Sequence, residues 1–275
     1  FCGVLDGQGH SVTIRCDRHC STGNYGDGAS VGLIGRLGAH DNDPADMRPS
    51  NAGVCNLAVY GEVYANRSVG GVVGKIGKTN GGATIENCAN FATVRNTDSK
   101  GVGGIVGSGW NAGLVKNCYN AGNVTSTYSC PTGGISGSNE IPLENCYNVG
   151  TIVAASRSFA MAIGTNNSGA SMKYITNCFY LEGSAPGGGY FDGKADNGGA
   201  LTSAEMKSDD FLNTLGPAFA KDSGHINNGY PVLSWQNPGG QTGDGTGTLG
   251  KKPEEAVSET EVKTETAISG GKATV

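Results

Sequence analysis

The chain has 275 residues, 16% of them charged, and a formal net charge of −5. This charge gives no basic surface of the kind that binds nucleic acid, and no run of 18 apolar residues is present that could cross a membrane. Because glycine is abundant (48 residues) and charge is sparse, the composition is typical of a stacked repeat rather than of a disordered polymer.

Two short motifs alternate along the chain. The first has the form glycine, two apolar residues, glycine, and occurs at residues 32–35, 71–74 and 104–107, with weaker copies at 134–137 and 161–164. The second reads apolar, any, Asn, Cys or Leu, any, Asn or Val. Its copies begin 31, 30, 28 and 32 residues apart, at Val54, Ile85, Val115, Leu143 and Ile175. A repeat of this period indicates an array of similar units.

Short Val- and Ile-rich stretches bounded by Gly, Asn, Thr and Ser predict strands, and none is long enough for a helix. We therefore predict an all-β fold, a right-handed parallel β-helix over residues 1–200. Successive units would stack about 4.8 Å apart, and parallel crossovers are nearly always right-handed.

Stacking would place equivalent residues above one another in columns. The Asn that begins each motif would form a hydrogen-bonded ladder: Asn87, Asn117, Asn145 and Asn177. A second ladder would consist of Asn90, Asn120 and Asn148.

The motif cysteines would form a column beside these ladders: Cys88, Cys118, Cys146 and Cys178. They are buried free thiols, disulfides or metal ligands. Leu57 holds the equivalent position in the first unit and can neither bridge nor ligate, which favours buried thiols.

Five further cysteines lie outside this column: Cys2, Cys16, Cys20, Cys55 and Cys130. A local disulfide among them stays open, and so does half of a zinc site at residues 16–20, although no second ligand pair follows.

The end of the chain departs from the repeat. Residues 202–205 form a capping-box pattern, and apolar positions up to Gly216 predict short helices before a strand at 230–235. We expect residues 201–236 to be a small helical and strand cap on the last unit, followed by a flexible linker at 237–266. Residues 267–275 read as the possible start of a further domain.

The alternating motifs carry a resemblance to a known family. The Gly-Leu-Ile-Gly at 32–35 looks like the GLUG motif, a repeat of bacterial surface proteins, and the Asn-Cys-Tyr-Asn copies at 117–120 and 145–148 match repeats found with it. The opening at 5–14 and the close at 228–235 also resemble these proteins. The resemblance implies an extracellular bacterial protein that is secreted or attached to the cell wall. Some members of the family are IgA-cleaving metallopeptidases, in which such repeat regions lie outside the catalytic part. No His-Glu-x-x-His is present here, so it implies no protease activity.

Two sets of residues are candidates for ligand contact. Three aromatic residues share one column and could stack on a sugar or dock a protein, or pack under loops: Tyr119, Tyr147 and Phe179. Three carboxylates on the loop of the first unit offer hard oxygen ligands for calcium: Asp41, Asp43 and Asp46. Pro44 breaks the EF-hand spacing, so a polar surface loop is the alternative.

These observations predict a non-catalytic module, an adhesin-like surface or a spacer, without cofactor. Its partners would be a host glycan or protein and other domains of the same polypeptide. The alternative is a carbohydrate-active β-helix that binds or cleaves a glycan, which requires paired carboxylates on one face.

Overall fold

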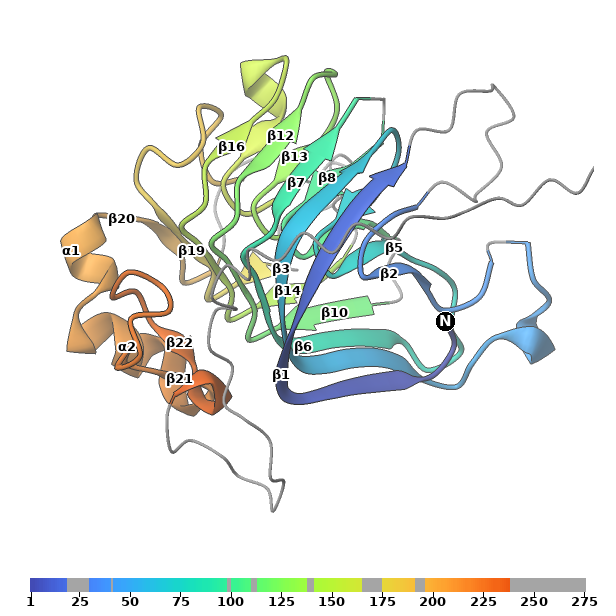
Figure 1. The fold of residues 1–275 in the computed structure, drawn as a ribbon, viewed down its shortest axis with the longest axis horizontal. Coiled ribbons are helices and arrows are strands. Elements are labelled where there is room, and N and C mark those ends of the chain that lie inside the picture. Colours follow the sequence, from blue (N-terminus) through green and yellow to red (C-terminus); the bar gives the residue numbers. More distant parts are fainter. Residues whose placement is uncertain are drawn as a thin grey trace, which may run out of the picture.

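The computed structural model describes residues 1–18, 30–40, 42–97, 100–109, 113–137, 141–164, 175–190 and 196–237. Figure 1 shows the strands of successive units lying side by side in sheets, with the helices near the C-terminus beside them. The prediction of an all-β fold with parallel sheets is confirmed, because the strands of the repeat pair in parallel throughout the described residues.

The largest sheet has 13 strands in the described residues and runs over three neighbouring faces of the stack. The first face is made by β1 (Val4–Arg18), β3 (Ala52–Ala65), β6 (Ala83–Asn90), β10 (Gly113–Lys116), β14 (Leu143–Glu144) and β18 (Ile175–Thr176). The second adds β11 (Tyr119–Asn120), β15 (Tyr147–Asn148), β19 (Phe179–Leu181) and β20 (Gly199–Leu201). The third consists of β7 (Thr93–Asn96), β12 (Val124–Ser126) and β16 (Ile152–Val153), which follow the later part of β3.

Two smaller parallel sheets complete each unit. The four-stranded sheet contains β4 (Val69–Gly70), β8 (Val102–Gly103), β13 (Thr132–Gly133) and β17 (Ala160–Met161). The three-stranded sheet contains β2 (Ile34–Leu37), β5 (Val73–Ile76) and β9 (Val106–Ser108). Short 3₁₀ turns lie in the loops at η2 (Ala45–Met47) and η3 (Arg157–Phe159).

The strand register follows the sequence repeat. Pairing joins equivalent residues of successive units in one column: Val54, Ile85, Val115, Leu143 and Ile175. These side chains are buried and fill the interior with the thiol column. The Asn two residues after each of these positions has positive φ, between 50° and 54°, which Asn tolerates better than most residues and which turns the chain onto the next face.

Each well-formed Gly-apolar-apolar-Gly element makes a tight corner between the two smaller sheets. A Cβ on Gly104 would collide with the backbone oxygen of Gly134 and with Oδ1 of Asn120. Gly71 meets Asn90 and Gly134 meets Asn148 in the same way. In these three units the first glycine of the motif is therefore required because a buried asparagine of the same unit fills the space beside it.

Residues 202–237, here called the strap, form a separate layer beside the stack (Figure 1). They contain α1 (Ser203–Met206), α2 (Asp209–Leu215), η4 (Gly216–Ala218), β21 (Phe219–Ala220), β22 (Val232–Leu233) and η5 (Ser234–Gln236). The predicted capping box is present, since Thr202 Oγ1 accepts from Glu205 N and the Glu205 carboxylate accepts from Thr202 N. Gly216 ends α2 with φ of 72°.

The strap lies along the side of the stack, whereas the sequence predicted a cap on its last unit. Its apolar residues Met206, Phe211 and Leu215 pack on the aromatic column of the second face. Trp235 reaches back to the second unit, where its Nε1 donates to the backbone oxygen of Asn87. The reason is that this column exposes a continuous apolar strip along the stack, and the strap covers it.

Candidate ligand groove

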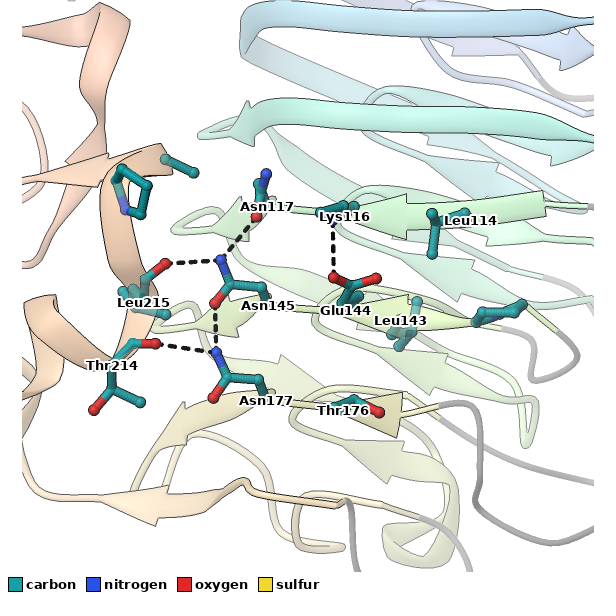
Figure 2. A pocket seen from close by; sticks show the side chains of 13 residues that line it. Leu114, Lys116, Asn117, Leu143, Glu144, Asn145, Thr176, Asn177, Thr214 and Leu215 are labelled. Atoms are coloured by element: carbon teal, nitrogen blue, oxygen red, sulfur yellow. Dashed lines mark hydrogen bonds and ion pairs between the residues drawn. The ribbon is translucent and has the colours of Figure 1, made fainter.

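A groove of about 600 Å³ runs between the first face of the stack and the end of α2 (Figure 2). One wall is the outer surface of β10, β14 and β18, and the other is formed by the strap. Its lining comprises Leu114, Lys116, Asn117, Pro142, Leu143, Glu144, Asn145, Thr176, Asn177, Thr214, Leu215, Pro217 and Ala218. The lining thus mixes aliphatic side chains with amides, hydroxyls and a single charge pair.

The asparagine ladder that contains Asn117, Asn145 and Asn177 is here called the outer ladder. These three amides run along the groove in one line (Figure 2). Asn145 Nδ2 donates to Asn117 Oδ1 at 2.7 Å and to Leu215 O at 2.9 Å. Asn177 Nδ2 donates to Asn145 Oδ1 at 2.6 Å and to Thr214 O at 3.3 Å. Both hydrogens of each of these two amides are therefore in use, so what they offer a ligand is mainly oxygen acceptors.

The outer ladder extends beyond the groove in both directions. Asn197 Nδ2 donates to Asn177 Oδ1 at 2.7 Å, and Asn87 Nδ2 donates to Asn56 Oδ1 at 3.2 Å. The step between Asn87 and Asn117 is interrupted: Asn117 Nδ2 lies 3.4 Å from Glu86 Oε1, and the buried Asn87 Oδ1 has no partner. Four predicted ladder residues are therefore in one column, but the hydrogen bonds form two runs.

One ion pair crosses the groove wall. Lys116 Nζ lies 2.9 Å from Glu144 Oε1, and this hydrogen bond raises the pKa of Lys116. Glu86 is in the same column on the other side of Lys116, as the strand register requires. Glu144 is the one carboxylate in the groove lining among the described residues. The lining therefore offers no pair of acid groups for general acid and base catalysis.

The predicted aromatic contact residues lie elsewhere, under the strap. Tyr119 and Tyr147 are fully buried with stacked rings 5.0 Å apart, and Phe179 is 8% exposed. Tyr119 Oη donates to Gln236 Oε1 at 2.9 Å, and Tyr147 Oη donates to the backbone oxygen of Pro231. The expectation that these three rings meet a ligand is corrected, because the chain itself occupies that surface. Burial raises the pKa of both tyrosines.

The four thiols predicted to form a column are fully buried and free. Each Sγ donates to the carbonyl oxygen two residues earlier, as Cys118 does to Lys116 O at 3.1 Å. Burial raises the pKa of Cys118 and Cys178. Outside the column, Cys2, Cys16 and Cys55 are also free thiols, and Cys130 Sγ lies 3.1 Å from Ser126 Oγ. Cys20 lies outside the described residues.

In the acidic loop of the first unit, polar groups of the loop form hydrogen bonds with one another. Asp43 Oδ2 accepts from His40 N at 2.7 Å, and the Arg48 side chain donates to Asp43 O. Asp46 is exposed in η2, and Asp41 lies outside the described residues. Within the described part of the chain, no three His, Cys, Asp or Glu residues are grouped as a metal site. Calcium binding by this loop stays a prediction.

Sequence reasoning found the asparagine column but not the groove, since the groove depends on where the strap docks. A signal for docking was present in the aromatic column, because exposed apolar rows are commonly covered. The signal did not say which segment covers it.

Stacked parallel units, two amide ladders and a lateral strap together define an all-β repeat protein. The chain carries the GLUG motif: the family model described as "The GLUG motif" matches residues 98–125. The matched residues include both Gly104 and Asn120, which meet at the tight corner of one unit.

A solved structure from Bacteroides ovatus, described as a "putative immunoglobulin A1 protease", is similar in fold. It shares 22% sequence identity with a TM-score of 0.53, over 84% of this chain and 77% of that chain. A comparison with curated proteins gave no match. Within the described residues, no helix has the length and apolarity needed to span a bilayer.

Proposed function

We propose that the chain is a right-handed parallel β-helix that serves as a non-catalytic binding module of a larger bacterial protein. The GLUG motif and the fold shared with the Bacteroides ovatus protein support a domain of a larger protein. By the same reasoning, the module is secreted or attached to the cell surface. It acts there as an adhesin-like surface or as a spacer between other domains of its polypeptide.

The groove beside the outer asparagine ladder is the surface at which such a module would bind. The observation that carries a binding role is the lone carboxylate of the lining, Glu144, tied to Lys116 at 2.9 Å. A charge pair of this kind can position a polar ligand, and the lining holds no second carboxyl group of the kind that glycoside hydrolysis uses. Acceptor oxygens from Asn145 and Asn177 would bind the hydroxyl or amide donors of a host glycan or protein.

A glycan array and a peptide array, each probed with the purified chain, test this function. Thr176→Trp places an indole in the groove, because Thr176 is exposed in the lining. Val153→Trp is the matched control, since Val153 is exposed on β16 and is not part of the groove lining. We expect binding that Thr176→Trp abolishes and Val153→Trp retains.

A reducing-end release assay on every bound glycan tests the non-catalytic part of the proposal. We expect no release. Release of sugar that Glu144→Gln or Asp43→Ala abolishes, in variants that still fold, would replace the proposal with a carbohydrate-active enzyme.

A further inference from the structure

The outer surface of the first face carries one column of alternating charge. The strand register joins Glu86, Lys116, Glu144 and Thr176 in succession, and an isolated bridge pairs Thr176 with Asp196. Equivalent positions of successive units lie about 4.8 Å apart, so each of these side chains is beside the next. The column therefore reads negative, positive, negative, neutral, negative, and it lacks a cation at the fourth position.

Lys116 shows what the equivalent gap one unit away holds. Its hydrogen bond with Glu144 and, less strongly, the charge of Glu86 raise its pKa, so this ammonium is placed between two carboxylates. The second gap, between Glu144 and Asp196, is occupied only by the exposed, neutral side chain of Thr176 (Figure 2). A cation from a ligand would complete the alternation there.

The groove wall beside this second gap is rich in acceptors and poor in donors. Both hydrogens of Asn145 Nδ2 and both hydrogens of Asn177 Nδ2 are used within the protein, so these side chains offer oxygens. Thr214 Oγ1 donates to Asp210 O at 2.9 Å, and this hydroxyl is then left to accept. A guanidinium group has only N–H donors and no acceptor, and is the complement of such a wall.

The remainder of the lining is aliphatic. Leu114 and Pro142 are half-buried, and Pro217 is exposed. Among the described residues, the lining has no aromatic ring on which a sugar could stack. An arginine side chain fits this mixture, because its methylene stem packs on apolar surface while its guanidinium binds carboxylates and amide oxygens.

We propose that the groove binds an arginine side chain of a protein partner, with the guanidinium over Thr176 between Glu144 and Asp196. This inference rests on the binding role proposed for the groove and names its ligand: a polypeptide with an exposed arginine rather than a neutral glycan. Arginine is favoured over lysine because its planar group donates in several directions at once. The net charge of −5 favours the approach of a basic partner.

An array of short peptides with arginine fixed at the centre, probed with the full chain, tests the ligand chemistry. The same array with citrulline keeps the shape of the side chain and removes its charge. We expect the arginine peptides to bind and the citrulline peptides to bind at least about tenfold more weakly. Equal binding of the two arrays overturns the proposal.

A pair of variants tests where the arginine binds. Asp196→Asn removes one carboxylate beside the gap and leaves the pair of Lys116 and Glu144 intact, so the Kd for the bound arginine peptides should rise about tenfold. Glu62→Gln is the matched control, since it removes the same charge from an exposed position of β3 outside the groove lining. Equal Kd values for these two variants contradict the proposed position.

A cation placed in the gap by substitution should compete with the ligand. Thr176→Lys puts an ammonium between Glu144 and Asp196 and should abolish peptide binding. Thr176→Gln adds a neutral side chain that extends almost as far, and should retain most of the binding. Equal loss in both variants would mean that bulk rather than charge excludes the ligand, and would overturn the proposal.

Failure of this inference is distinguishable from failure of the binding role. A glycan or peptide whose binding is abolished by Thr176→Trp but unchanged by Asp196→Asn would leave the groove as a binding site and overturn the arginine proposal. If no glycan or peptide on the arrays depends on the groove in this way, both proposals are wrong.

Discussion

The two asparagine ladders use the same side chain in different surroundings. Asn90, Asn120 and Asn148 are completely buried, and each Nδ2 donates both to the carbonyl oxygen two residues later and toward the next unit. The outer ladder is partly exposed, is interrupted between Asn87 and Asn117, and gives two of its hydrogen bonds to the strap. The inner ladder therefore stabilises the stack itself, whereas the outer ladder also holds a neighbouring segment.

The direction of the hydrogen bonds also differs. Amide donors of the inner ladder point toward the C-terminal end, where Asn148 Nδ2 lies 3.4 Å from Ser184 Oγ. Donors of the outer ladder point toward the N-terminal end, where Asn56 Nδ2 donates to Asp6 Oδ1 at 3.1 Å. Asp6, whose hydrogen bonds with Gln8 N and Asn56 lower its pKa, accepts the last hydrogen bond and cannot pass one on. Burial determines how much stability is lost when a residue of either ladder is changed, because a buried amide that loses its partner cannot form a hydrogen bond with water instead.

The largest effect should come from the glycine beside the inner ladder. Gly104→Ala forces a Cβ into Asn120 Oδ1 and the backbone oxygen of Gly134, neither of which can move freely. We expect a loss of about 4 kcal/mol in the free energy of unfolding, or failure to fold. Urea denaturation measures it, with Gly3→Ala as the control because that Cβ meets only the ring of Phe1 at 3.5 Å. Equal stability of the two variants would contradict the tight corner.

Removing one member of the inner ladder should have the next largest effect. Asn120→Ala removes one of the two hydrogen bonds that Asn90 Nδ2 donates, and it removes the donor that Asn148 Oδ1 and Gly122 O accept from in the interior. We expect a loss of about 3 kcal/mol. The outer-ladder variant Asn145→Gly, measured in the same way, should lose about 1 kcal/mol, since water can replace part of what is removed. A larger loss of stability for Asn145→Gly than for Asn120→Ala would contradict the distinction between the two ladders.

Alkaline pH should weaken the interior and the strap together. Burial raises the pKa of Cys118, Cys178, Tyr119 and Tyr147 above ordinary values of 9.0 and 10.0. Their stabilising contribution is complete below those values and is lost as the unfolded chain begins to ionise above them. The free energy of unfolding should fall by about 1.4 kcal/mol per pH unit for each such group. Denaturation at pH 8 and at pH 10.5 measures this fall. An equal free energy of unfolding at the two pH values would mean that these thiols and phenols are exposed to water rather than buried.

The smallest effect should come from the charge pair of the groove. The side chains of Lys116 and Glu144 are 35% and 44% exposed, so water screens their attraction. Lys116→Ala should change the free energy of unfolding by less than about 0.5 kcal/mol. Thermal denaturation at low and high salt checks this value. A large, salt-dependent loss would show that the pair stabilises the fold rather than the groove surface.

The repeat spacing carried most of the information about the stack. Motif copies about 30 residues apart predicted which residues pair, and positive φ at the first Asn followed from its place at a corner. The thiol column could be predicted because Leu57 occupies the same position.

Other features could not be read from the motifs alone. The strap buries apolar residues in either position, on the last unit or along the side, so its hydrophobic pattern did not distinguish them. The same holds for Tyr119 and Tyr147, whose place in the repeat fixes an outward direction but not what covers them. The link between Gly104 and Asn120 also escaped, since the two motifs are separated by 16 residues and meet only when the unit closes.

A double-mutant cycle on Asn145 and Asn177 tests the stacking of units most directly. These residues are 32 apart in sequence, and their side chains are joined by a hydrogen bond of 2.6 Å. Glycine replaces each of them, because it removes the amide and keeps the positive φ of 53° and 52°. A coupling free energy of about 1 kcal/mol is expected, with additive behaviour for Asn145 and Asn197, two steps apart. Additive effects for Asn145 and Asn177, within about 0.3 kcal/mol, would contradict the stacked arrangement.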